Sequence, residues 1–223
     1  MPDLITVEAF DLESMDADGA IREAEDAVAG DTRADFFRKA ALGGGAMVGG
    51  GVLLSGLPSL ALAAPSKKQD VAILNYALTL EYLEAAFYTE AVAKGAISGD
   101  ALSGARIVRD HEVTHVKTLK SVLGKKAVKK PKFDFKNTTG DQATFLATAV
   151  ALEDTGVAAY AGQGPRLKQK PIIVAALSIH SVEARHAAYF RTLAGMSFAP
   201  KAFDQAKSMK QVLKVVKGTG FLG

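Results

Sequence analysis

Apolar residues recur at steps of three and four from Asp70 onward, which is the period of an α-helix. This pattern predicts four long helices, over about 69–94, 98–123, 141–162 and 171–194, followed by a short basic amphipathic helix over about 208–217. Glycines stand where three of the long helices are expected to end, and Pro171 suits the first turn of the fourth. The sequence therefore predicts an all-α domain.

The connections between these helices predict the topology. Short links join the first helix to the second and the third to the fourth, as expected for antiparallel neighbours. The link over 125–140 is longer, and its sixteen residues could extend over roughly 53 Å. A 23-residue helix is only about 35 Å long. We therefore expect a four-helix bundle with one long crossover, which makes the second and third helices parallel.

Charge divides the chain near residue 63. Residues 1–63 contain 4 Lys+Arg and 11 Asp+Glu, a net charge of −7, which leaves 23 basic and 13 acidic residues, net +10, for residues 64–223. The first part is acidic and poor in aromatic residues, as solvated leaders are. We predict a leader with an export signal or anchor over 1–63, and the bundle with its C-terminal tail over 64–223.

The end of the leader has the parts of an export signal. A basic segment over 32–39 precedes 25 uncharged residues, 40–64, and a small-x-small site at Ala61-Leu62-Ala63. The segment resembles a twin-arginine signal, although Ala34 replaces the second arginine. We predict export to the periplasm, cell envelope or medium. A membrane anchor over 40–64 is the alternative, and its seven glycines weaken it, each costing about 1 kcal/mol of helix propensity.

The candidate chemistry begins with two pairs of residues. Glu112 precedes His115 by three positions in the second helix, and Glu183 precedes His186 in the same way in the fourth. Residues three apart share a helix face, so each pair can direct a carboxylate and an imidazole at one point. With four histidines in the chain, two such pairs are expected by chance in only about 1% of comparable sequences.

The first and third helices supply one further glutamate each. Glu81 and Glu153 both follow a leucine, and both are followed by Ala at plus five and Tyr at plus seven. The separation from Glu81 to Glu112 is 31 residues, and that from Glu153 to Glu183 is 30. The sequence thus predicts two similar helical hairpins, each with one Glu and one Glu-x-x-His directed at a common centre, the pattern of dinuclear metal bundles.

Charge favours a metal centre over four glutamates that are simply buried. Transferring one carboxylate to a low-dielectric interior has an idealised cost of about 20 kcal/mol, and two divalent cations would neutralise four carboxylates. The chain contains no cysteine, so a metal must be held by oxygen and nitrogen. These donors suit iron or manganese better than soft metals. We expect two iron ions, with manganese as the alternative.

The first helix resembles a known family. Residues 74–81, Leu-Asn-Tyr-Ala-Leu-Thr-Leu-Glu, are similar to the first-helix motif of the ferritin-like superfamily, Leu-Asn-x-x-Leu-x-x-Glu. The segment from about 70 to 194 resembles exported bacterial ferritin-like domain proteins, which include desiccation-related proteins. The resemblance implies a ferritin-like bundle in which two metals have terminal ligands Glu81 and Glu153, bridging and catalytic ligands Glu112 and Glu183, and nitrogen ligands His115 and His186.

Other residues near the predicted centre have two interpretations each. We expect Glu84 at the edge of the bundle, with an additional ligand as the alternative. His111 and His180 are expected to support the ligands or face solvent instead of binding metal directly. Tyr88 and Tyr160 are expected to pack in the core, with a phenol that donates to the metal site as the alternative.

The resemblance implies a reaction of the metal pair with O2 or H2O2, in a ferroxidase or oxidative-stress role. Two alternatives remain open, a stress-related envelope protein whose metals only stabilise the bundle, and peroxide dismutation of the manganese catalase kind. The six lysines of the crossover indicate a solvated loop, so no nucleic-acid partner is expected. A homodimer is compatible with the sequence.

Overall fold

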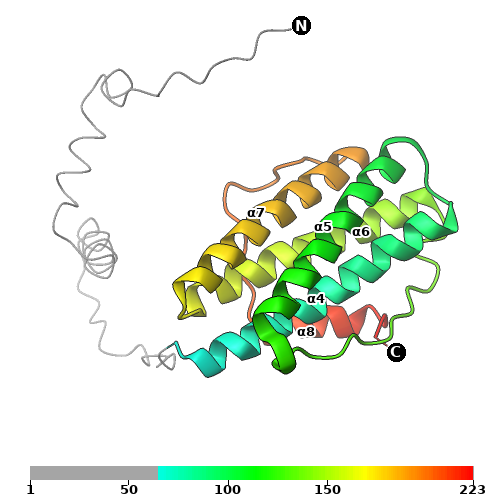
Figure 1. Cartoon of the computed structure of the whole chain (residues 1–223). Coiled ribbons are helices and arrows are strands. Elements are labelled where there is room, and N and C mark those ends of the chain that lie inside the picture. The colour runs from blue at the N-terminus through cyan, green and yellow to red at the C-terminus, as the bar shows by residue number, and fades with distance from the viewer. Residues whose placement is uncertain (1–64, 223) are drawn as a thin grey trace, which may run out of the picture. The chain divides into compact units, whose positions relative to one another are not determined.

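The computed structural model describes residues 65–222 (Figure 1). It contains four long helices and one short helix: α4 (Lys67–Lys94), α5 (Gly99–Leu123), α6 (Gln142–Gln163), α7 (Lys170–Leu193) and α8 (Met209–Gly218). The four predicted long helices and the short C-terminal helix are confirmed, with boundaries within about two residues of the expected ones. The predicted leader, export signal and alternative anchor over 40–64 lie outside the described residues.

The helices form two antiparallel hairpins, α4 with α5 and α6 with α7, that pack together as a four-helix bundle (Figure 1). The crossover from α5 to α6 runs along the bundle, so that α5 and α6 point the same way. The Asn75 side chain holds this crossover against α4, because it donates to the Lys126 carbonyl at 2.9 Å and accepts from the Val128 amide at 2.8 Å. The predicted all-α topology with one long crossover is therefore confirmed.

Local side chains fix the helix ends. Ser66 accepts a hydrogen bond from the Gln69 amide at 3.1 Å and Asp141 accepts one from the Thr144 amide at 2.9 Å, which caps α4 and α6. Gly95 ends α4 in a left-handed conformation with φ of 69°, which a residue with a Cβ adopts only with strain. These caps fix where α4 and α6 begin and where α4 ends. They thereby fix the position of the inward-facing residues of these helices along the bundle axis.

The two helices of each hairpin are covered unequally. In α4, 15 of 28 residues are buried, and in α6, 13 of 22, compared with 6 of 24 in α7. The extra burial arises because the crossover and α8 cover α4 and α6 on the outside (Figure 1). Gly162 on α6 permits the segment just before α8 to lie close to this helix, since a Cβ on Gly162 would lie 1.9 Å from the Lys207 carbonyl oxygen. Helices α4 and α6 are therefore the inner helices of the domain.

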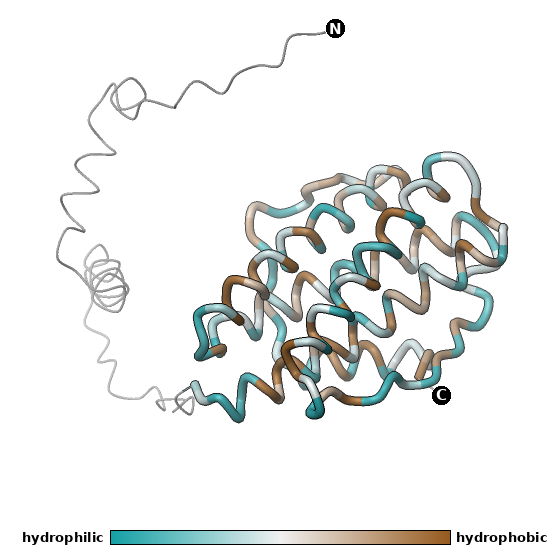
Figure 2. The backbone as a smooth tube through the Cα atoms, in the orientation of Figure 1, coloured by the Kyte–Doolittle hydropathy of each residue, from teal (hydrophilic) through white to brown (hydrophobic). Residues whose placement is uncertain are grey.

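The apolar core consists of two clusters, and the partly buried Phe133 and Met209 pack against both of them. One cluster is aromatic, with the rings of Phe87 and Phe145 stacked at 5.4 Å and those of Tyr88 and Phe190 at 5.5 Å. The other is aliphatic and includes Leu78 toward the start of α4. Figure 2 shows hydrophobic and hydrophilic residues alternating along the helices. None of the helices within residues 65–222 combines the length and apolar character that a membrane span needs.

Candidate metal centre

The six predicted ligands lie together in the interior of the bundle. The inner helices α4 and α6 contribute one glutamate each, and α5 and α7 contribute one Glu-x-x-His each. The four glutamates have 0% exposed surface, and the two histidines have 9% or less. Because three residues make nearly one helical turn, the Glu and His of each pair face the same interior point. The structure brings together all six: Glu81, Glu112, His115, Glu153, Glu183 and His186.

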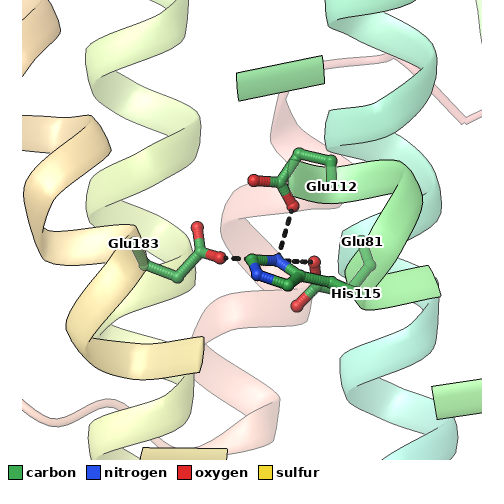
Figure 3. A group of neighbouring side chains, drawn as sticks. All are labelled: Glu81, Glu112, His115 and Glu183. Carbon is green, nitrogen blue, oxygen red and sulfur yellow. Dashed lines mark hydrogen bonds and ion pairs between the residues drawn. The ribbon is translucent and has the colours of Figure 1, made fainter. Parts of the chain in front are cut away.

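The first half of the centre surrounds His115 (Figure 3). Its Nδ1 atom lies 3.1 Å from an oxygen of Glu81, 3.3 Å from Glu112 Oε2 and 3.2 Å from Glu183 Oε1. One donor atom from each of these four residues lies within 4.8 Å of the others. Three carboxylates and one imidazole thus face one small volume.

The second half has the same arrangement around His186. Its Nδ1 atom lies 3.2 Å from Glu112 Oε1, 3.2 Å from Glu153 Oε2 and 3.8 Å from Glu183 Oε2. Glu112 and Glu183 therefore direct one oxygen at each imidazole, whereas Glu153 contacts only this one. The geometry distinguishes two shared carboxylates from two terminal ones.

The two imidazoles carry too few protons to give every nearby carboxylate oxygen a hydrogen bond. Each Nδ1 atom can carry one proton, yet three carboxylate oxygens surround it. Within residues 65–222, Glu112 Oε1 and both oxygens of Glu183 are buried and receive no hydrogen bond. Buried carboxyl oxygens without a hydrogen bond are costly, and a cation in each half would compensate them. The residues present therefore fit a pair of metal ions.

Electrostatics indicate how the centre holds its charge without metal. Burial alone would lower the pKa of both imidazoles, but the surrounding carboxylates outweigh it and raise the pKa of His115 and of His186 to about 12. Burial raises the pKa of Glu153 to about 8 and that of Glu112 well above its usual range. Burial would also raise the pKa of Glu183, but the two imidazoliums lower it to about 2. Metal ions must displace the protons held here.

Two tyrosines connect the hairpins at the terminal carboxylates. The Tyr88 hydroxyl on α4 donates a hydrogen bond to Glu153 on α6, and the Tyr160 hydroxyl on α6 donates one to Glu81 on α4. Both phenols are buried, as expected for core residues, and both also take the alternative role of hydrogen-bond donors. Each terminal carboxylate is thus oriented by the opposite hairpin.

The remaining histidines differ from each other. His111 Nδ1 lies 2.9 Å from His186 Nε2, on the side of the ring away from the carboxylates. Burial and the charges on His186 and His115 lower the pKa of His111, so it stays neutral and accepts a hydrogen bond from His186. His180 Nδ1 is buried without a hydrogen bond from the described residues, and His180 belongs to neither half of the centre.

Glu84 corrects one expectation. We expected it at the edge of the bundle, but it is 3% exposed and lies in the interior, three residues after Glu81 on the same face of α4. A Cβ on Gly156 would lie 3.2 Å from Glu84 Oε1 and 3.3 Å from Glu183 Oε2, so the absent side chain at Gly156 leaves room for both carboxylates. Glu84 is a fifth buried glutamate, outside both four-residue groups.

Replacing Glu84 with glutamine should stabilise the chelated protein at alkaline pH. Burial, followed by the charges of Glu183 and the other glutamates, raises the pKa of Glu84 well above 4.5. In the unfolded chain this carboxyl ionises near 4.5, so stability falls as pH rises from there toward the folded pKa. We expect Glu84→Gln to melt higher than the parent at pH 8, with a difference that shrinks toward pH 4.5.

Glu90 on the same helix provides the matched control. Burial would raise its pKa, but hydrogen bonds from Lys94 and Thr139 outweigh burial and lower it. Glu90→Gln should therefore lower the melting temperature at pH 8, the opposite sign. A Glu84→Gln variant that loses stability at pH 8 would show that Glu84 is ionised in the folded protein.

Comparison with known proteins agrees with this architecture. Residues 69–196 match the ferritin-like domain family, a span that covers all four long helices and the six converging ligand candidates. The chain belongs to the ferritin-like domain family. A search of curated proteins found no match. This ferritin-like protein therefore combines the fold of that family with a buried Glu/His cluster.

Proposed function

We propose that this ferritin-like protein binds two divalent metal ions in the buried centre. The observation that supports this most directly is the set of buried oxygens on Glu112 and Glu183 that receive no hydrogen bond from the described residues, with each of the two residues facing both imidazoles. In the proposed assignment, Glu81 and Glu153 are the terminal ligands, Glu112 and Glu183 are shared, and His115 and His186 provide Nδ1.

We propose iron as the metal, with manganese as the alternative. Four hard carboxylates and two imidazoles suit both ions and disfavour soft metals. When bound, a pair of iron ions supplies redox chemistry with O2 or H2O2. The chain contributes the buried surroundings that exclude bulk water, the tyrosines that orient Glu81 and Glu153, and His111, which fixes the ring of His186.

Access for a small oxidant is supported by a hollow between α5 and α7. Its volume is about 240 Å³, and its lining includes His111 and His186 together with Val108 and Tyr189. His186 therefore lies between this hollow and the carboxylates. A molecule the size of O2 or H2O2 in the hollow would meet the imidazole side of the centre first.

Oxidation of Fe(II) under air tests the proposal. The parent protein should oxidise Fe(II) faster than buffer does, and Glu112→Ala should reduce the rate to that of buffer, because the variant lacks a carboxylate shared by both halves. Metal-dependent melting without oxidation would assign the metals a structural role only. Oxygen release from peroxide by the manganese-loaded protein would indicate catalase chemistry instead.

Export to the cell envelope and the relation to desiccation proteins remain proposals from the sequence. The twin-arginine-like segment over 32–39 and the small-x-small site at 61–63 support export, and the resemblance over about 70–194 supports the relation to desiccation proteins. An oxidative-stress role outside the cytoplasm would combine this location with the proposed reaction of the centre. N-terminal sequencing of the protein from its host would show whether cleavage occurs near residue 63.

A further inference from the structure

The crossover and α8 lie together on the outside of the inner helices (Figure 1). The Asp134 amide donates to the Phe221 carbonyl at 2.9 Å, which joins the crossover to the segment that follows α8. Phe135 in the crossover and Val212 and Val216 in α8 are at most 2% exposed and belong to the aromatic core cluster. These three side chains fill the inner side of both segments, so the exposed side chains of both face outward.

Lysines are concentrated in these two segments. Residues 125–140 and 208–218 contain nine of the 23 basic residues of the domain but only one of its 13 acidic residues, a net charge of +8. In the described part of the chain, only Lys136 among the nine forms an ion pair, with Asp134 at 2.7 Å. We call these two segments the basic strip. All nine lysines are exposed: Lys125, Lys126, Lys129, Lys130, Lys132, Lys136, Lys210, Lys214 and Lys217.

Exposed aliphatic side chains lie among these lysines. On α8, Leu213 and Val215 flank Lys214 and are 45% and 42% exposed, and Val128 in the crossover is 38% exposed. The basic strip contains no arginine, tyrosine or tryptophan. Surfaces that bind nucleic acids typically add arginines, and aromatic rings that stack on bases. Lysines combined with exposed aliphatic residues instead suit the boundary between the headgroups and acyl chains of an anionic membrane.

We propose that the basic strip docks the protein on the surface of an anionic phospholipid membrane. The lysines contact the lipid headgroups, and Leu213 and Val215 enter the boundary between headgroups and acyl chains. Attachment is peripheral, because no helix within residues 65–222 has the length and apolar character of a membrane span. Each lysine that reaches an anionic surface strengthens binding about fivefold, so affinity rises steeply with their number. The proposal does not depend on metal binding.

Flotation of the full chain with lipid vesicles tests the proposal. At about 0.1 M salt, vesicles of phosphatidylcholine with about one-third phosphatidylglycerol should bind the protein more tightly than pure phosphatidylcholine vesicles do. Raising the salt to about 1 M shortens the Debye length from about 10 Å to about 3 Å and should remove this difference. An anchor over 40–64 would act on both kinds of vesicle. Equal affinity for neutral and anionic vesicles at low salt would therefore contradict the proposal.

Two double variants locate the surface that binds. Lys132→Gln with Lys214→Gln removes two charges from the basic strip and should weaken binding to the anionic vesicles about 30-fold. The control, Lys117→Gln with Lys170→Gln, removes the same charge from α5 and α7 and should weaken it less than about threefold, because distant charges are screened. All four side chains are exposed, so both variants should fold. Equal weakening by the two variants would assign the attraction to net charge and contradict docking by the basic strip.

A third double variant separates a lipid surface from a nucleic acid. Leu213→Ser with Val215→Ser retains every lysine and should weaken binding to the anionic vesicles about tenfold, since apolar area no longer leaves water. It should not affect binding to a DNA duplex, which depends on phosphate charge. Unchanged vesicle binding by this variant would overturn the proposal. Tighter binding of the parent to a DNA duplex than to anionic vesicles, at equal phosphate concentration, would assign the basic strip to nucleic acid instead.

Discussion

Metal loading should raise the free energy of unfolding by about 2.7 kcal/mol per ion when the free metal is at 100 times its dissociation constant. Two ions would contribute about 5 kcal/mol, which corresponds to a melting temperature higher by roughly 10–20 °C for a domain of this size. The effect is expected because the four ligand glutamates are fully buried and the unfolded chain offers no preformed site. Thermal melting with Mn(II), with anaerobic Fe(II) and with chelator measures it.

A variant without the shared charges provides the control for this experiment. In the double variant Glu112→Gln, Glu183→Gln, both halves of the centre lose two of their three carboxylates. Its melting temperature should not respond to metal, although the metal-free variant should still fold, because neutral amides are cheaper to bury than carboxylates. A parent protein that melts alike with Fe(II), Mn(II) and chelator would contradict the proposed centre.

The second large effect concerns how many ions remain bound after single substitutions. Glu112 faces both imidazoles, whereas Glu81 contacts only His115. We therefore expect Glu112→Gln to weaken both sites by more than about 100-fold, a loss beyond that typical for a residue that only supports a ligand. Glu81→Gln should retain one ion. Equilibrium dialysis with elemental analysis at fixed free metal counts the ions.

His186 and His180, both on α7, provide a variant and its matched control for the same measurement. His186→Ala should weaken loading, and His180→Ala, on the same helix but outside the centre, should retain both ions. Retention of both ions by Glu112→Gln, or loss of both by Glu81→Gln, would contradict the division into shared and terminal carboxylates. A stronger effect of His180→Ala than of His186→Ala would show that His186 is not the nitrogen ligand.

The sequence predicted the helices and the six converging residues because both depend on local spacing. Glu112 and His115 share a face through their three-residue separation alone, and the repeat of the pattern at Glu183 gave the second half. The link over 125–140 was long enough to require a crossover. These features follow from short-range geometry, which a single chain displays directly.

What the sequence could not predict depends on which faces are covered. Glu84 shares the face of Glu81 by the same three-residue rule, but its burial required knowing that α4 is an inner helix. Each tyrosine is hydrogen-bonded to a glutamate of the opposite hairpin, and the two partners are separated by 65 positions in one pair and by 79 in the other. Gln163 carried no signal at all, because only the structure shows that its amide is buried without a hydrogen-bond partner among the described residues.

The crossed tyrosine contacts have a consequence for symmetry. Exchanging Glu81 with Glu153, Glu112 with Glu183, and each accompanying histidine and tyrosine with its counterpart reproduces the same set of contacts, so the centre has an approximate two-fold axis. Two copies of a single hairpin related by such an axis would present the same ligands and the same phenols. The covalent chain thus encloses an arrangement that a smaller, self-associating protein made of a single hairpin would already possess.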